Sequence, residues 1–422
     1  MEHDPWADHP CRPGADAWSL PLERIDPSNP RLYAENAWGP VFARLRRDAP
    51  VHYCSNSPFG PYWSVTRFRD IRHVDSQHQV FSSEPTVLLG NPPKDFYLQP
   101  GFIAMDPPRH TQTRAAVQPA LGQANLALLE PLIRARVEGI LDGLPVGEEF
   151  DWVSRVSIEL TTQMLATLFD FPFEERHLLT HWSDVATSSP RNPGPVKLSA
   201  EEWRCTMREC LERFTALWHE RASRPPREPL DLVTLLAQNP ATRGMQPMDY
   251  LGNLLLLIVG GNDTTRHSLS GGVLALHENP AELAKLRADP GLVNSLVPEI
   301  IRWQTPLAYM RRTAVTDVEL AGQKIRAGEK VLMWYLSGNR DLSEIPDADR
   351  FVVDRAQPRH HLGFGFGIHR CMGNRLAEMQ LRIAWEEILK RFSRIEVCGD
   401  PVRVMSSFVH GFEKLLVRVH AA

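Results

Sequence analysis

The sequence predicts a mainly α-helical protein with a minor β region, forming one domain over residues 1–422. Apolar residues recur at helical spacing from about 101 to 309. The segments 1–100 and 310–422 instead combine short β-type runs with helices and Gly-containing turns. No regular alternation of strands and helices is present, which argues against a parallel sheet or barrel. No Ser/Gly linker or internal repeat divides the 422 residues, so we expect a single large domain.

The first hundred residues predict a mixed segment. "GPYWSVTRFRDIRHV" (60–74) has the pattern of a strand followed by a helix. The polar, Pro-containing N-terminus lacks the charged-then-apolar order of a signal peptide. The longest dense apolar run, "LLLLIV" (254–259), is far below the ~20 residues that span a bilayer. We therefore expect a cytoplasmic protein without a membrane span, and the net charge of −4 gives no reason to expect nucleic acid as a partner.

The middle of the chain predicts long helices. Apolar residues near i, i+3, i+4 and i+7 indicate helices within 125–144, 157–170, 199–222 and 248–280. Between the second and third, "TSSPRNPGPVKLS" (187–199) contains three prolines and a glycine, which indicates a flexible connector.

The C-terminal part begins with "TAVTDVELAGQKIRAGEKVLMWYL" (313–336), whose short β-type runs predict a small sheet. A Pro-punctuated loop then leads to "HLGFGFGIHRCMGNRLAEMQ" (361–380). Beyond its cysteine, four apolar residues fall on one face of a predicted amphipathic helix: Met372, Leu376, Met379 and Ile383.

Cys371 is the cysteine whose surroundings predict chemistry. Four glycines bracket it, and glycine suits a backbone that takes positive φ or approaches a flat group closely. At the start of a helix, N–H groups and the helix dipole stabilise a thiolate. A thiolate in that position can bind a metal.

Several interpretations of this loop compete. A nucleotide-binding loop fails because Arg370 stands where a third glycine is needed. A Cys/His nucleophile with His369 is open, but residues two apart on a loop do not form a dyad. A zinc site from His360, His361, His369 and Cys371 lacks paired spacing. A buried structural cysteine explains neither the glycines nor the basic neighbours. The interpretation that explains both is a thiolate ligand to haem iron.

The same stretch resembles a family signature. "FGFGIHRCMG" is similar to the Phe-x-x-Gly-x-x-x-Cys-x-Gly motif of the cytochromes P450, with Phe364, Gly367, Cys371 and Gly373 at its fixed positions. The resemblance implies the P450 fold, a triangular helical prism enclosing haem b (iron protoporphyrin IX), with Cys371 as axial iron ligand. It also implies an oxidoreductase of the monooxygenase type that uses O2, because a thiolate ligand favours O–O cleavage.

Upstream residues match further parts of the family pattern. "PEIIRW" supplies Glu299 and Arg302, a Glu-x-x-Arg pair that shares one helical face. By resemblance this pair is structural and joins the loop containing Arg350 and Arg355 in a buried ion network.

"VGGNDTTRH" (259–267) lies within the long apolar helix. By resemblance it is the oxygen-binding groove, where Gly260 and Gly261 clear room over the haem and Asp263 and Thr264 form an acid–alcohol pair. Reduction of O2 to water consumes protons, which a carboxylate and a hydroxyl can carry into an apolar pocket. A bend in a solvated helix would have a similar composition.

Basic residues at three places are, by resemblance, partners of the haem propionates. They are His110 and Arg114 in "MDPPRHTQTR", Arg312 in "RRTA", and His369. Charge-assisted hydrogen bonds to two carboxylates are the physical reason. Each could equally be a surface charge.

The sequence is also similar to the bacterial P450 subfamily that hydroxylates the terminal carbon of medium-chain alkanes and fatty acids. The resemblance implies an apolar substrate pocket, which we place at Val87, Leu257, Leu307, Met310, Phe408 and Val409. P450 hydroxylation of a sterol or terpenoid side chain is the alternative reaction, and a non-catalytic haem-binding module is the alternative of another class.

The resemblance implies two protein partners, a ferredoxin and its reductase on separate chains, with electrons ultimately from NAD(P)H. Arg370, Arg375, Arg382, Lys390 and Arg391 would offer them a basic face, although such a run is also typical of a solvated surface. We expect a monomer that binds a hydrophobic small molecule and uses O2 in preference to peroxide.

Overall fold

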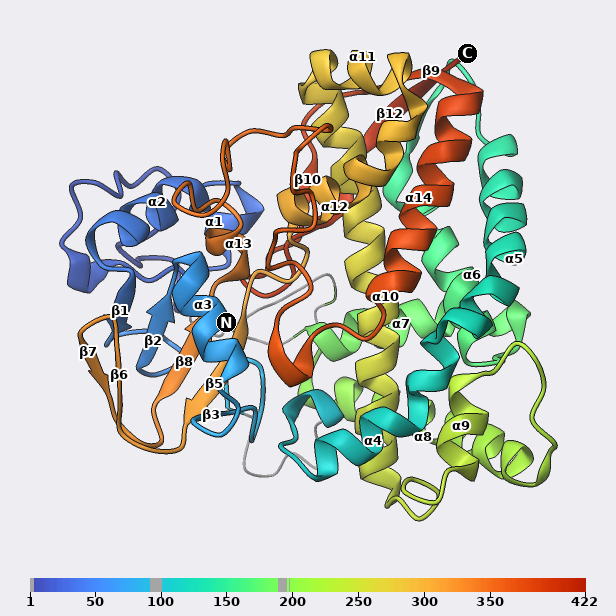
Figure 1. The fold of residues 1–422 in the computed structure, drawn as a ribbon, viewed down its shortest axis with the longest axis horizontal. Coiled ribbons are helices and arrows are strands. Elements are labelled where there is room, and N and C mark those ends of the chain that lie inside the picture. Colours follow the sequence, from blue (N-terminus) through green and yellow to red (C-terminus); the bar gives the residue numbers. More distant parts are fainter. Residues whose placement is uncertain (1–3, 92–100, 189–195, 197) are drawn as a thin grey trace.

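The computed structural model describes residues 4–91, 101–188, 196 and 198–422 of the chain. Helices dominate one side of the molecule and a small sheet occupies the other (Figure 1). The helices are α1 (Arg31–Ala34), α2 (Trp38–Asp48), α3 (Phe68–Ser76), α4 (Arg109–Val117), α5 (Gln123–Asp142), α6 (Glu159–Leu168), α7 (His177–Thr187), α8 (Ala200–Ser223), α9 (Leu232–Gln238), α10 (Pro247–Glu278), α11 (Pro280–Ala288), α12 (Val293–Gln304), α13 (Tyr335–Gly338) and α14 (Asn374–Arg391).

The main sheet has five strands in the order β1-β2-β8-β5-β3. β2 and β8 run parallel, with Trp63 opposite Val331, and the other neighbours are antiparallel. A three-stranded sheet, β4-β12-β9, and two hairpins complete the β structure. The strands are β1 (Val51–Cys54), β2 (Tyr62–Val65), β3 (Phe81–Ser82), β4 (Glu149–Asp151), β5 (Met310–Ala314), β6 (Val318–Leu320), β7 (Gln323–Ile325), β8 (Lys330–Met333), β9 (Phe392–Val397), β10 (Val402–Arg403), β11 (Phe412–Lys414) and β12 (Leu416–Ala421).

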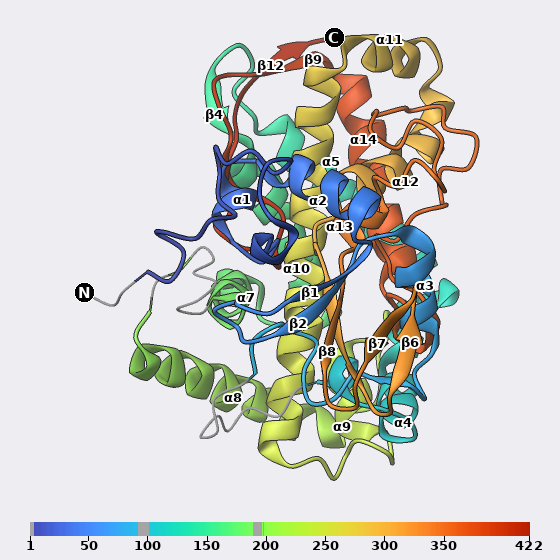
Figure 2. The same cartoon turned by 90° about the vertical axis from the view of Figure 1, so that its left-hand side faces the viewer.

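The long helix α10 is the axis of the helical side. It passes through the middle of the molecule in both views, with α12 and α14 on one side of it and α7 on another (Figures 1 and 2). From Tyr250 to Leu276 most of its side chains are buried all round the helix, because packed helices surround it. Its central position lets the helix contribute residues between Met248 and Ser268 to a cavity wall, while the turns from Leu269 to Leu276 are buried in the core.

These elements confirm the predicted fold class, mainly helical with a minor β region. The predicted strand and helix of 60–74 are β2 and α3, and the four long helical patterns correspond to α5, α6, α8 and α10. A π-helical turn at Val153–Ile158, which the pattern did not predict, precedes α6. The predicted connector 187–199 lies mostly outside the described residues.

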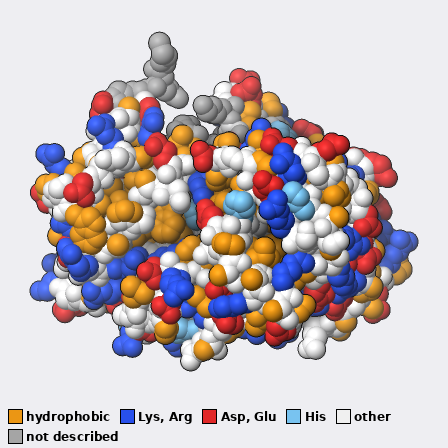
Figure 3. All heavy atoms as spheres, turned by 90° about the horizontal axis from the view of Figure 1, so that it is seen from above, with side chains coloured by type: hydrophobic (Ala, Val, Ile, Leu, Met, Phe, Trp, Pro, Cys, Tyr) orange, Lys and Arg blue, Asp and Glu red, His pale blue; other side chains and the backbone are white. Residues whose placement is uncertain are grey.

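Surface composition agrees with the small net charge of −4. Acidic and basic side chains are interspersed over the face seen in Figure 3. None of the helices within the described ranges combines the length and the apolar character required to cross a bilayer.

Candidate active site

The loop before α14 holds Cys371 by backbone contacts. The amide of Cys371 donates to the carbonyl oxygen of Phe364 over 2.8 Å, which closes the loop. Gly365 and Gly367 both have φ of +64°, a conformation that favours glycine. A Cβ at Gly367 would collide with the carbonyl oxygen of Asp75. Gly365 and Gly367 therefore serve the close approach of this loop to α3.

The sulfur of Cys371 faces a cavity inside the protein. Burial raises the pKa of its thiol, while the Gly373 amide and the guanidinium groups of Arg114 and Arg370 act in the opposite direction. The contributions of the amide and the two guanidinium groups have the direction predicted for a thiolate at the start of a helix, and burial opposes them. Coordination to a metal cation deprotonates a thiol in such a position.

Two histidines meet beside the loop. The rings of His110, on α4, and His369 lie 4.2 Å apart between centroids, and neither ring nitrogen of either residue has a hydrogen-bond partner among the described residues. Burial lowers the pKa of His110 to about 4 and that of His369 to about 2. Buried polar atoms in proteins are nearly always paired, so four orphaned nitrogens indicate a missing polar partner.

Two arginines complete this cradle. His369 and Arg114 line the cavity, whereas His110 does not, and Arg114 donates to the carbonyl oxygen of Arg370 over 2.6 Å. Arg312, on β5, also lines it and forms a buried ion pair of 2.7 Å with Asp75. Two neutral imidazoles and two guanidiniums fit a pair of carboxylates such as the propionates of haem. The residues predicted as propionate partners are thus brought together.

Asp75 was not predicted from the sequence. Its Oδ2 accepts from the Tyr335 hydroxyl at 2.8 Å and from the Phe366 amide at 2.7 Å, while its Oδ1 accepts from Arg312. One buried carboxylate therefore joins α3, the sheet and the cysteine loop. The sequence carried no signal for it, because its partners are hundreds of residues away.

The opposite wall of the cavity is the middle of α10. Thr264 lines the cavity, and its hydroxyl donates to the carbonyl oxygen of Gly260 over 2.9 Å. A Cβ at Gly260 would meet open space, whereas one at Gly261 would collide with the side chain of Leu165 on α6. Gly260 therefore leaves space within the cavity, and Gly261 lets the Leu165 side chain pack closely against α10.

Asp263 points away from the cavity, toward α7. Its Oδ1 accepts from the Ser183 hydroxyl at 3.0 Å and lies 3.1 Å from a guanidinium nitrogen of Arg266, which also pairs with Asp184. Burial raises the pKa of Asp263, and its Oδ2 has no partner among the described residues. The predicted acid and alcohol are adjacent in sequence but lie on different faces of the helix.

The buried ion network is present at the predicted residues. Arg302 forms two hydrogen bonds with Glu299, at 2.7 and 2.8 Å, and both side chains are fully buried. Arg355 adds a contact of 2.9 Å to the same carboxylate. Arg350 takes part through its carbonyl oxygen, which accepts from Arg302 over 2.8 Å. The network fixes the loop that leads to Cys371.

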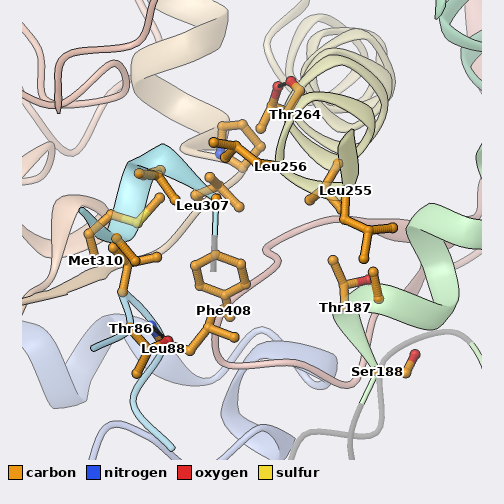
Figure 4. Close-up of a pocket in the computed structure, with 18 of the residues that line it drawn as sticks. Thr86, Leu88, Thr187, Ser188, Leu255, Leu256, Thr264, Leu307, Met310 and Phe408 are labelled. Atoms are coloured by element: carbon orange, nitrogen blue, oxygen red, sulfur yellow. Dashed lines mark hydrogen bonds between the residues drawn. The ribbon is translucent and has the colours of Figure 1, made fainter. Parts of the chain in front are cut away.

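The cavity between Cys371 and α10 has a volume of about 2550 Å³. A pocket for one drug-sized ligand has roughly 300–1,000 Å³, so this cavity has room for a flat macrocycle and a further molecule. Figure 4 shows Thr264 at one end, Leu307 and Phe408 further along, and Leu88 at the other end.

Most of the predicted pocket residues line this cavity: Val87, Leu257, Leu307, Met310 and Phe408. Val409 does not; it is buried in the core that packs behind Leu307, with which it forms an antiparallel bridge. The prediction missed Leu256, although Leu256, Gly260 and Thr264 follow each other at four-residue spacing and so share a face of α10. That spacing was a usable signal.

A cysteine that lines a cavity with room for a macrocycle, beside a cradle for two carboxylates, fits a haem-thiolate site. Comparison with known proteins agrees. The family model "Cytochrome P450" matches residues 63–408, and the chain belongs to the cytochrome P450 family.

Individual relatives cover nearly the whole chain. Linalool 8-monooxygenase from Pseudomonas putida is 38% identical over 94% of this chain and 99% of its own length. A methyl-branched lipid omega-hydroxylase from Mycobacterium tuberculosis is 29% identical over 89% and 90%. The solved structure of CYP153D17 from Sphingomonas sp. PAMC 26605 is 46% identical, with a TM-score of 0.88 and coverage of 94% and 100%. The protein is a P450 monooxygenase, and its family implies haem and O2.

Proposed function

We propose that this monooxygenase inserts one oxygen atom from O2 into the terminal C–H bond of a medium-chain alkane or fatty acid. The observation that carries the proposal is the apolar character of the cavity between its outer end and Thr264. Leu255 and Leu256 line one side, and Leu307 and Met310 another (Figure 4). A hydrocarbon chain fits such walls because its burial removes apolar surface from water.

Terminal attack depends on positioning. A primary C–H bond is stronger than the neighbouring secondary bonds, so the walls must hold the methyl end in place and keep the methylene groups away. Leu256, Gly260 and Thr264 form one face of α10 at the inner end, where Gly260 leaves space for a methyl group. We assign the positioning of the chain end to this face.

The haem, when bound, supplies the oxygen chemistry, with Cys371 donating electron density through its sulfur. His110, Arg114, Arg312 and His369 would hold the propionates. The net reaction consumes the substrate, O2, two electrons and two protons, and yields an alcohol and water. The electrons come from NAD(P)H through a separate ferredoxin and its reductase.

Two residues of α10 would handle the protons. The Thr264 hydroxyl donates its hydrogen to the carbonyl oxygen of Gly260, which leaves the Oγ1 lone pairs free to accept a hydrogen bond from water in the cavity and so to position that water as a proton donor. Burial raises the pKa of Asp263, which is the direction that a general acid requires. Because Asp263 faces α7, it would take protons from that side and pass them through water.

The test is turnover by the haem-loaded protein with ferredoxin, reductase and NAD(P)H. We expect dodecane and dodecanoic acid to give mainly the terminal alcohol, identified by mass spectrometry of the products. Mainly in-chain alcohols would contradict the proposal. No turnover with any reductant would indicate a non-catalytic haem-binding module, and turnover with hydrogen peroxide alone would indicate a peroxide-driven enzyme.

Hydroxylation of a terpenoid side chain is the second candidate, because a relative named for linalool is 38% identical across nearly the whole chain. Linalool belongs in the same assay as a competing substrate. A higher kcat/KM for linalool than for either twelve-carbon substrate would favour this candidate.

A further inference from the structure

Helix α8 contributes two parallel rows of side chains to the cavity. Trp203, Met207 and Leu211 follow each other at four-residue spacing, so they share one face of the helix, and all three line the cavity. Arg204 and Arg208, each one position further on, line the cavity as well and are exposed at its outer end. An apolar row and a cationic row therefore lie side by side.

Neither of these two guanidinium groups has a hydrogen bond or an ion pair with a residue that the structure describes. The arginines further along differ. Arg213 of α8 pairs with Glu175 at 2.8 Å, and Arg221 of α8 and Arg224, directly after the helix, both contact Asp170, at 2.8 and 2.6 Å. These arginines thus have carboxylate partners on another segment of the chain, whereas the two that line the cavity have none among the described residues.

Positively charged side chains outnumber negatively charged ones around the cavity. Outside the propionate cradle, the charged lining residues are Asp4, Arg31, Arg204, Arg208, Arg403 and Glu413. Arg31 is neutralised by Asp4, at 2.6 Å. The N-terminal segment and the first turns of α8 lie on the same side of the molecule (Figure 2). This region would attract an anion.

We propose that Arg204 and Arg208 bind the carboxylate of a fatty acid whose chain lies along Trp203, Met207 and Leu211. This inference rests on the proposed function and narrows its substrate class to carboxylate-bearing chains. The backbone positions of Arg204 and Arg208 lie about 6 Å apart along the helix axis, since each residue adds 1.5 Å, and their side chains leave the helix on the same face. One carboxylate can therefore accept charge-assisted hydrogen bonds from both.

Binding at that end also sets the direction of the chain. With the carboxylate held at the outer end, the methyl group leads into the cavity toward Thr264. Orientation by charge would then add to the shape of the walls in directing oxygen to the terminal carbon.

The experiment compares dodecanoate with two uncharged analogues, methyl dodecanoate and dodecane. For the wild type and the double variant Arg204→Gln/Arg208→Gln, the dissociation constant is measured by difference-spectrum titration, together with KM, kcat and product positions. We expect the double variant to raise the dissociation constant and KM of dodecanoate about tenfold and to lower the share of terminal product. The kcat of dodecanoate and all constants of the two uncharged analogues should stay within about twofold.

Arg243→Gln is the matched control, because Arg243 is exposed, has no side-chain partner among the described residues and does not line the cavity. It should leave dodecanoate binding unchanged. Raising the salt concentration should weaken dodecanoate binding to the wild type and have little effect on the double variant.

Two results would overturn the inference: unchanged dodecanoate binding in the double variant, or equal weakening for the methyl ester, which would show that the arginine stems act by packing. These results are distinct from failure of the proposed function. In that case the wild type would give no terminal product from any of the three substrates, whatever the variants do.

Discussion

The two walls of the cavity are built in different ways. The wall that carries Cys371 is fixed by hydrogen bonds: the Leu362 amide donates to Asn339 over 2.7 Å, the Phe366 amide to Asp75 over 2.7 Å, and the Cys371 amide to Phe364 over 2.8 Å. The rest of the cavity is lined largely by apolar side chains from α8, α10 and the loops that carry Leu88, Leu307 and Phe408. The three loop residues are labelled in Figure 4.

This difference separates chemistry from selectivity. A hydrogen-bonded loop has one geometry, and a single lost partner leaves a buried polar group unsatisfied. A wall of apolar side chains tolerates changes of size with smaller losses of stability. The cysteine wall therefore determines that the protein is an oxygenase, and the opposite wall determines what it oxidises.

The largest effect is expected for Cys371→Ser on the hydrogen-bonded wall. A serine hydroxyl cannot replace a thiolate as electron donor, so the thiolate-type band of the ferrous carbonyl complex should disappear and turnover should fall by at least about a hundredfold. Cys205→Ser, at an exposed cysteine, is the control and should change neither. A retained thiolate band in Cys371→Ser would assign the ligand to another residue.

The next effect is on stability. Glu299→Gln removes the charge that two arginines share, which should lower the free energy of unfolding by about 3–5 kcal/mol. Glu378→Gln breaks the exposed pair with Arg359, at 3.1 Å, and should cost less than about 1 kcal/mol. Denaturant unfolding of the haem-loaded variants measures both. Similar losses of unfolding free energy in the two variants would mean that the buried Glu299 network contributes no more to stability than an exposed ion pair.

The Glu299 network also sets a pH dependence. Burial would raise the pKa of Glu299, but the hydrogen bonds from Arg302 and Arg355 outweigh it and lower the pKa. A lowered pKa in the folded state gives stability that is present above the ordinary range of a glutamate and is lost as the pH falls through the lowered value. The melting temperature of Glu299→Gln should therefore fall less steeply in acid than that of the wild type.

The sequence predicted the hydrogen-bonded wall better than the apolar one. A fixed backbone geometry demands particular residue types at particular spacings, so Gly367, Cys371 and the Glu299–Arg302 pair could be read from short motifs. Asp75 could not, because it connects segments that meet only in the folded chain. Helical spacing could have shown that Asp263 and Thr264 point in different directions, but not that Asp263 meets α7, because that neighbour is set by the tertiary fold.

The apolar wall was harder to predict from the sequence, because many apolar residue types can occupy its positions. The same apolar residue types line cavities and fill the protein core, so residue type alone does not distinguish the two positions. Leu307 and Val409 were predicted together, yet Leu307 lines the cavity and Val409 packs behind it. Helical spacing on α10 was the exception, because it relates Leu256 to Gly260 and Thr264 without any tertiary information.

Thr264→Ala should affect coupling more than binding. Without the hydroxyl, proton delivery at the inner end of the cavity fails, so the yield of product per NAD(P)H should fall about tenfold while hydrogen peroxide rises. Thr264→Ser keeps the hydroxyl and should restore most of the yield. Product and peroxide are measured together with NAD(P)H consumption. Equal coupling in the alanine variant would remove Thr264 from proton delivery.

The smallest effects come from the apolar wall, where two neighbouring residues make a matched pair. Leu307→Ala enlarges the cavity and should lower the ratio of terminal to in-chain product several-fold, since one or two methylene groups are worth about 1–3 kcal/mol in a pocket. Val409→Ala leaves the lining intact and should cost about 2 kcal/mol of stability with an unchanged product ratio. Product analysis and unfolding curves separate the two. If both variants changed the product ratio equally, core residues behind the lining, such as Val409, would also determine selectivity. The distinction between lining and core at Leu307 would then be wrong.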